Sequence, residues 1–304
     1  MQSKGGKSAV KKSTASRTIF MIINYILLIA TSLICLLPFV NLLAISFSDS
    51  AASTAGKVTF WPVNFTTKSY EFIITGGAFF PALWVSVKRV LLGVFVNMVL
   101  MVLTAYPLSK TKAQLRGRNI YMIFFVITML IGGGLIPTYL LVVRLGLLDS
   151  IWALILPGAL PVYNMIILMN FMRTLPVELE EAAMIDGAGP FTVLVRVILP
   201  LLTPALATVG LFCVVGHWNE WFSGLIYMQK TIHYPLQTYL QSLLKNMDVI
   251  MRLATTDYIK LLSLMSARTG RAAQLFLAAL PMMLVYPYLQ KYFTTGLVLG
   301  SVKG

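Results

Sequence analysis

The residues of this chain that could bind a polar ligand gather where a long apolar run ends. The segment His217-Trp218-Asn219-Glu220-Trp221 places two indole rings beside an amide and a carboxylate. Aromatic faces with planar hydrogen-bonding groups suit a sugar, which has apolar ring faces and a rim of hydroxyl groups. An interfacial belt of aromatic side chains with a water-exposed Glu220 explains the same residues equally well. The candidate ligand-contacting residues are Trp218, Asn219, Glu220, Trp221 and Asn164.

The sequence lacks the residue patterns that metal binding, a disulfide or a phosphate-binding loop would need. No pair of Cys or His has metal-ligand spacing, and Cys35 and Cys213 each fall in an apolar run, so neither a metal site nor a disulfide is expected. Gly6-Lys7-Ser8 ends like a phosphate-binding loop, but Met1 stands where that motif needs its first glycine. The chain is therefore expected to have no catalytic residue and to bind no cofactor itself.

Composition indicates where these residues must lie. Of 304 residues, 58% are hydrophobic and only 11% are charged, whereas a soluble domain carries about 25% charged residues. A soluble globular enzyme, a disordered chain and a disulfide scaffold are excluded. The net charge of +14 does not indicate nucleic-acid binding, because the basic residues form short clusters between apolar runs, as in a membrane protein.

Charge-free runs long enough to cross a bilayer predict an all-α protein with six transmembrane helices. They cover residues 19–47, 90–108, 120–143, 150–172, 197–219 and 272–290. Lys88 and Arg89 lie at the outer end of the second span and are either snorkelling anchors or ligand contacts, and the former is favoured. Asn97, Asn164 and Asn170 either face a path or join helices, and the latter is favoured. Gly132-Gly133-Gly134 marks either a hinge or close helix packing in the third span.

Basic residues predict the orientation. The N-terminal tail, residues 1–18, has five basic residues and no acidic one, and the segment after the second span is also purely basic. Positive charge favours the cytoplasmic side, so both termini are expected inside. The segment of about residues 225–271 is then outside, although it is basic. The loop at 174–200 is inside although it is acidic, which topology does not explain.

The acidic loop has the features of a docking element. A helix over its glutamates would be stopped by Gly187, and a second helical segment would lead to Pro200. Glu181-Ala182-Ala183, then Gly187, then Val197-Ile198-Leu199-Pro200 resembles the EAA loop of ABC-importer permeases, with Val197 in place of the family's Ile. The resemblance implies that an ATPase is contacted through Glu181, Ala182, Ala183, Asp186, Gly187, Leu199 and Pro200.

The C-terminal end carries a second resemblance. Residues 295–304 resemble the Gly-Leu-x-x-Gly-x-Val-Lys-Gly end of maltose-type sugar permeases, where the tail reaches the ATPase dimer. The matching tail residues are Gly300, Val302, Lys303 and Gly304. Trp218-Asn219-Glu220 is similar to a segment of the same family. The stretches at 133–139 and 286–293 look like the branch named for lipoprotein and aldouronate transport, whose members serve oligosaccharides.

The resemblance implies a type I ABC importer permease fold, with a transmembrane domain at 19–296 and a cytoplasmic tail at 297–304. The chain would be a non-enzymatic subunit moving an oligosaccharide across a bacterial cytoplasmic membrane. Its partners would be a second, non-identical permease, two ATPase subunits carrying ATP and Mg, an extracytoplasmic sugar-binding protein and membrane lipid, with no nucleic acid. The alternative is an ion-coupled secondary carrier, in which Glu220 and His217 would bind the ion.

Overall fold

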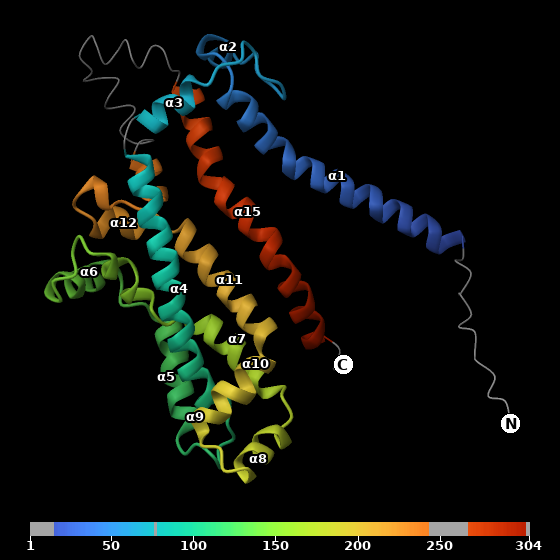
Figure 1. Cartoon of the computed structure of the whole chain (residues 1–304), viewed down its shortest axis with the longest axis vertical. Helices are drawn as coiled ribbons and strands as arrows, with labels where there is room; N and C mark the ends of the chain where they lie inside the picture. The colour runs from blue at the N-terminus through green and yellow to red at the C-terminus, as the bar shows by residue number, and fades with distance from the viewer. Residues whose placement is uncertain (1–14, 76–77, 243–266, 302–304) are drawn as a thin grey trace. The chain divides into compact units, whose positions relative to one another are not determined.

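The computed structural model describes residues 15–75, 78–242 and 267–301, and every regular element with bounds in these ranges is a helix. This confirms the all-α prediction (Figure 1). The chain divides into two compact units. The first contains residues Met1–Ser69 and Leu264–Phe276, and the second contains Tyr70–Ser263 and Leu277–Gly304. Each unit is described by itself.

The first unit is built around helix α1 (Ala15–Ser46) and the short α2 (Ser50–Thr54). Asp49 caps α2, since its carboxylate accepts the N–H of Ala51 at 3.2 Å. Ala44, Ala52 and Ala272 belong to its small core, and the Arg268 guanidinium donates to the carbonyl of Ser53 at 3.1 Å. In the apolar stretch of α1 that is long enough to span a membrane, no residue is buried. Such an apolar surface requires lipid or another protein around it.

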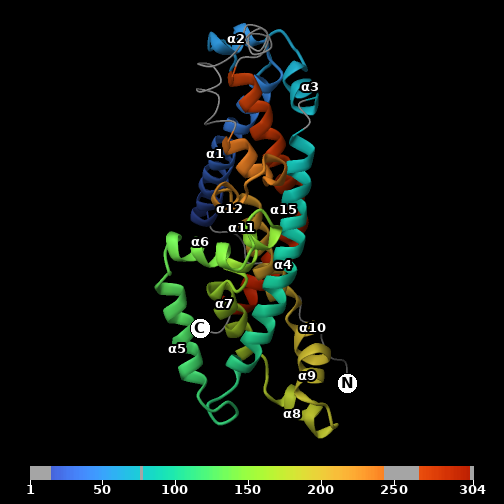
Figure 2. The same cartoon turned by 90° about the vertical axis from the view of Figure 1, so that its left-hand side faces the viewer.

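The second unit is centred on α4 (Phe79–Ser109), which packs mainly on α7 (Val162–Arg173) and α11 (Thr203–Asn219). Met101, Met165 and Met169 are almost completely buried where these helices meet. Unbranched methionine side chains fill irregular space between helices well. In both views α8 (Glu178–Ile185) and α9 (Pro190–Val193) lie near the C-terminal end of α4, and α12 (Phe222–Tyr227) lies beside its N-terminal half (Figures 1 and 2).

The remaining elements of the second unit are short. They are α5 (Arg118–Leu130), α6 (Leu135–Arg144), η1 (Ile151–Leu154), η2 (Leu156–Gly158), the π-helical η3 (Leu194–Ile198), α10 (Leu199–Leu201) and η4 (Thr231–His233). Helix α3 (Lys68–Thr75) leads into this unit, and α15 (Ala267–Ser301) contributes to both units.

Single straight helices account for only some of the predicted spans. Two described helices, α1 and α4, are long and apolar enough to cross a membrane alone. Three other predicted spans are bent helix pairs, with bends of 107° between α5 and α6, 53° before α7 and 84° before α11. The sixth predicted span falls within α15. Helix α4 begins 11 residues before the charge-free run at 90–108, so Lys88 and Arg89 lie inside it.

The bend between α5 and α6 is a glycine break. Gly134 has φ +83° and ψ 167°, a conformation that residues with a Cβ rarely adopt. A Cβ built on Gly132 or Gly133 would meet no atom of the described residues within 4 Å, so these two glycines serve no close packing against that part of the chain. Of the two interpretations left open by the sequence, the structure favours a break in the helix.

We expect Gly134→Ala to lower the free energy of unfolding by about 1–3 kcal/mol, because alanine is strained at this backbone conformation. Gly133→Ala is the matched control, since it adds the same methyl group in open space. Thermal unfolding midpoints of the two purified variants test this. Equal midpoints would show that the break does not depend on Gly134.

Candidate functional site

The most buried charge among the described residues is that of Arg89, whose residue is 3% exposed. Its guanidinium donates to the Glu220 carboxylate at 2.6 Å, the Glu220 carbonyl at 2.8 Å and the Ser223 hydroxyl at 3.0 Å. A longer bond of 3.4 Å reaches the carbonyl of Leu154. Arg89 therefore ties α4 to η1 and to the junction of α11 and α12. Burying a guanidinium is tolerable only with such a set of partners.

A second polar contact lies two helical turns further along α4. The Asn97 amide nitrogen donates to the carbonyls of Gly158 at 3.1 Å and Ala159 at 2.7 Å. The Asn97 oxygen is then free to accept, and the His217 Nε2 lies 2.8 Å from it, so Nε2 carries the proton. A Cβ on Gly93 would meet the His217 ring at 2.5 Å, which explains the glycine there.

These groups border an open cavity of about 420 Å³. Its wall includes Arg89, Asn97, Asn164, His217 and Glu220, together with apolar side chains such as Phe212. Arg89 Nε is buried here without a hydrogen-bond partner. The cavity therefore offers amide, carboxylate and guanidinium groups beside apolar surface, which is the combination that orients a polar ligand.

The structure places two of the five predicted ligand-contacting residues in the cavity wall and the other three elsewhere. Asn164 and Glu220 line the cavity. Trp218 is buried, and its indole N–H donates to the carbonyl of Ala278 in α15 at 3.3 Å. Asn219 is exposed at the end of α11, and Trp221 is half-buried with its carbonyl accepting from Thr238. Whether any of the five contacts a ligand stays a prediction.

The interpretation of Arg89 that the sequence favoured, a snorkelling anchor, is wrong. A snorkelling anchor would be exposed, as Lys88 is, with its ammonium 5.4 Å from the Trp84 ring centroid. Arg89 points inward because Glu220, 131 positions away in sequence, neutralises it. Ser223 was also missed. A basic residue at the edge of a charge-free run, together with a lone acidic residue at another, was the available signal.

The acidic loop forms the second candidate site. Helix α8 has no buried residue, and Glu178, Glu181, Ala182 and Ile185 lie on one exposed stripe at helical spacing. Ile185 is 85% exposed. Ala183 is half-buried and packs toward the core of the second unit, so it lies on the other side of the helix from this stripe. An exposed apolar side chain beside small residues leaves room for a protein partner.

Gly187 ends α8 as the sequence predicted. Its φ is +83°. The N–H of Gly187 donates to the carbonyl of Met184 at 3.0 Å, and the N–H of Ala188 donates to the carbonyl of Ala183 at 3.0 Å. This pair of bonds is the Schellman motif. Asp186 precedes the turn and is exposed, and a Cβ on Gly187 would meet nothing within 4 Å. The turn therefore presents an uncovered backbone.

The inner side of α8 is held to the end of α4. The Lys110 ammonium forms an ion pair with the Glu180 carboxylate, and both side chains are 16% exposed. The same ammonium lies 4.1 Å from the centroid of the Tyr106 ring, which is buried in the core. One cation thus joins the acidic loop to the helix that carries Arg89.

The end of the motif is a continuous helical segment with one wide turn. The N–H of Leu199 bonds to the carbonyl of Leu194, five residues back, just before Pro200. Leu199 is half-buried against the core, and Pro200 is exposed. At the C-terminus, the backbone of Gly300 is helical within α15. Val302, Lys303 and Gly304 lie outside the described residues.

At the other end of the second unit, Asp149 joins two loops. Its carboxylate accepts the N–H groups of Gln229 at 3.0 Å and Lys230 at 3.2 Å, and lies 2.9 Å from His233 Nδ1. Burial opposes ionisation, but these hydrogen bonds outweigh it and hold the pKa of Asp149 below its usual value. Within the described ranges, no group of three or more His, Cys, Asp or Glu side chains could hold a metal ion.

Comparison with known proteins shows full-length relatives. The chain is 38% identical over 288 residues to the "polygalacturonan/rhamnogalacturonan transport system permease protein YtcP" of Bacillus subtilis, covering 94% of this chain and 99% of that protein. It is 36% identical over 293 residues to "Protein LplC" of the same organism, covering 96% and 97%. No protein-family model matches the chain.

A solved structure is also similar. It is a crystal structure of a bacterial ABC transporter involved in the import of the acidic polysaccharide alginate. One of its chains matches with a TM-score of 0.82 and 30% sequence identity, covering 92% of this chain and 98% of that chain.

We expect Glu220→Gln to destabilise the chain more than Arg89→Gln does. Glu220→Gln leaves a nearly inaccessible guanidinium without a counter-charge, whereas Arg89→Gln leaves a carboxylate whose side chain is 37% exposed. Removing one partner of a buried pair lowers the free energy of unfolding by about 3–5 kcal/mol. Because the Glu220 side chain is partly exposed, we expect Glu220→Gln to cost about 3 kcal/mol or less. The double variant should recover part of the loss, as measured by thermal unfolding. A double variant as unstable as the sum of both singles would show that the charges are not coupled.

Proposed function

This chain belongs to the permease subunits of carbohydrate ABC transporters, and on that premise we propose that it couples oligosaccharide passage to a separate ATPase through α8. The family makes it a multi-pass protein of the cytoplasmic membrane and a transport subunit rather than an enzyme. The proposed residues of the ATPase contact are Glu181, Ala182, Asp186 and Gly187, with Ala183, Leu199 and Pro200 positioning them.

The observation that carries the proposal is the uncovered stripe of α8. Glu181, Ala182 and Ile185 are exposed together, and the Gly187 turn has open space around it. A helix with apolar and small side chains outward and no buried residue is not made for this chain's own core. It fits a cleft in another protein, and Ala183 stabilises it by packing inward.

The cavity at Arg89 supports a role in the translocation path. We place Asn164 and Glu220 on that path, together with Asn97 and His217, which line the same cavity. A sugar offers hydroxyl groups to the amides and the carboxylate and an apolar ring face to Phe212, which also lines the cavity. Trp218 supports the path indirectly, by holding α11 on α15.

The complete importer would contain further subunits. They are a second, non-identical permease that closes the path, two cytoplasmic ATPases that hold ATP and Mg, and an extracytoplasmic sugar-binding protein. The relative YtcP is named for polygalacturonan and rhamnogalacturonan transport, and the solved relative imports alginate. These names support an oligosaccharide as the substrate class. In this arrangement both termini are cytoplasmic, as are α8 and the tail from Gly300.

Family membership sets aside the ion-coupled carrier. That alternative needed Glu220 and His217 to bind the driving ion. In the structure Glu220 is already neutralised by Arg89, and His217 donates to Asn97.

We expect Gly187→Trp to abolish co-purification of the ATPase, because an indole would occupy the space that the partner needs. Gly146→Trp is the matched control, since Gly146 also has a positive φ of +66° and open space around it. Glu181→Lys should weaken the same contact. The assay is affinity purification of this chain with its neighbouring permease and ATPase. Retention of the ATPase by both Gly187→Trp and Glu181→Lys, with the chain inserted in the membrane, would contradict the proposal.

We expect Lys110→Glu and Glu180→Lys to reduce sugar uptake at least several-fold each while the ATPase stays bound. Each change places like charges in a contact that joins α8 to α4. The double exchange Lys110→Glu with Glu180→Lys restores opposite charges and should recover uptake. Uptake and ATP hydrolysis are measured together in proteoliposomes. Failure of the double exchange to recover uptake, with normal ATPase binding, would show that this ion pair does not transmit movement.

A further inference from the structure

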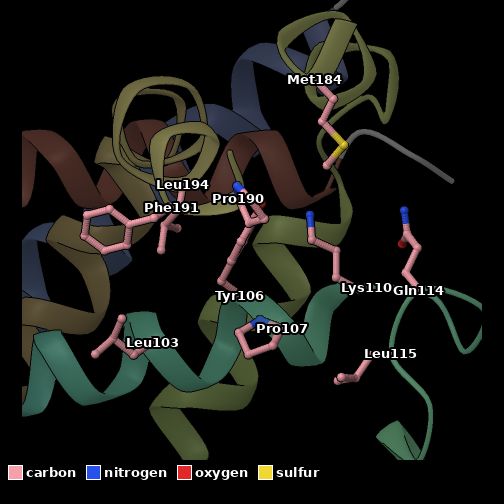
Figure 3. A pocket seen from close by; sticks show the side chains of 10 residues that line it. All are labelled: Leu103, Tyr106, Pro107, Lys110, Gln114, Leu115, Met184, Pro190, Phe191 and Leu194. Carbon is pink, nitrogen blue, oxygen red and sulfur yellow. The ribbon is translucent and has the colours of Figure 1, made fainter. Parts of the chain in front are cut away.

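Two cavities adjoin at the end of α4, and together they have the chemistry of an amphiphile's binding site. One, of about 370 Å³, has a mixed lining that includes Lys110, Arg118 and Arg173, and we call it the polar cavity. The other, of about 420 Å³, is mainly apolar and includes Leu103, Phe191 and Leu194. They share Lys110 and Gln114. Figure 3 shows the apolar cavity, with side chains of α4 facing those of the acidic loop and Lys110 and Gln114 at one side.

The polar cavity has an excess of positive charge. Three cations face one carboxylate, that of Glu180, and Lys112 and Arg116 lie exposed in the adjoining loop. The Arg118 Nε and the Arg173 Nη2 donate to the carbonyl of Leu108, at 2.9 and 3.1 Å. This shared acceptor fixes both guanidinium groups and leaves their remaining N–H groups available to an anion.

These three cations lie at the depth where a lipid headgroup would lie. Lys110 follows the last residue of α4, Arg118 is the first residue of α5, and Arg173 is the last of α7. All three helices belong to candidate membrane spans, so their shared end lies near the membrane surface. With the proposed orientation this is the cytoplasmic leaflet, where basic pockets between helices attract acidic headgroups.

The apolar cavity would be left uncovered by a free anion. Phe191 is 70% exposed beside it, and Leu103 is also exposed. The Tyr106 hydroxyl is buried without a hydrogen-bond partner, and its ring stands beside the Lys110 ammonium. A hydrocarbon chain would cover the apolar residues.

We propose that the cytoplasmic end of α4 binds one anionic phospholipid, with its phosphate at Lys110, Arg118 and Arg173 and an acyl chain along Leu103, Phe191 and Leu194. Phe191 and Leu194 belong to the acidic loop, so the lipid would support the loop from the membrane side, leaving the stripe of α8 free. This site goes beyond the proposed function, because no step of sugar passage or ATPase docking requires it.

The test is lipid retention by the full-length chain with its associated subunits. The protein is released from nanodiscs of equal parts phosphatidylglycerol and phosphatidylcholine, and native mass spectrometry counts the lipids bound to this subunit. The wild type should retain phosphatidylglycerol preferentially. Arg118→Gln with Arg173→Gln should lower that preference about thirty-fold, equivalent to about 2 kcal/mol at 1.4 kcal/mol per decade.

The control is Arg144→Gln, which removes an exposed basic residue at the end of α6, away from both cavities. It should leave the preference unchanged. Phe191→Ser should reduce phosphatidylglycerol retention by removing a chain contact. If the double arginine variant fails to fold, phosphatidylglycerol retention by Phe191→Ser tests the proposal alone.

Three results would overturn the proposal. The first is equal retention of both lipids by the wild type. The second is an unchanged preference in the double arginine variant or unchanged retention in Phe191→Ser. The third is displacement of the lipid by millimolar glycerol phosphate, which would identify a site for a free anion. Because lipid retention requires neither uptake nor ATPase binding, failure here is distinct from failure of the proposed function.

Discussion

A guanidinium buried between membrane helices has to find all its partners within the protein, and Arg89 imposes this requirement on the second unit. Its partners come from η1, from the carbonyl and carboxylate of Glu220, and from Ser223. Helix α11 must therefore end at Asn219, so that the chain can turn and present both groups of Glu220. The turn into α12 and the irregular backbone at η1 follow from the same requirement. Irregular backbone at depth is tolerated where it lines a cavity.

Helix α4 carries both candidate sites. Lys110, the first residue after α4, lies 21 positions after Arg89, which corresponds to roughly 30 Å at 1.5 Å per residue. This is about the thickness of the hydrocarbon layer. Each basic side chain is paired with an acidic one from a different part of the chain, Glu220 at one end and Glu180 at the other. The cavity and the acidic loop are thus attached to the same rigid element.

The sequence predicted features that depend on local composition. Apolar runs located the helical segments, and the glycine at 187 predicted the end of α8 with its left-handed turn. The glycines at 132–134 left a hinge open, but the sequence did not predict the size of the 107° bend there or the 84° bend before α11, because hydropathy is the same on both sides of a bend. It also misassigned Arg89, whose burial depends on a carboxylate 131 positions away. Trp218 and Glu220 are two residues apart, yet one packs on α15 and the other lines the cavity.

The two sites are held in different ways, and this bears on how movement would pass between them. The cavity is held by the ion pair and hydrogen bonds of Arg89 and by the hydrogen bonds of Asn97, whereas α8 has no buried residue and is held on its inner side by Lys110 and Ala183. The buried methionine core between α4, α7 and α11 lies between the two sites. Because closely packed cores do not deform continuously, a displacement of α8 would move these helices together.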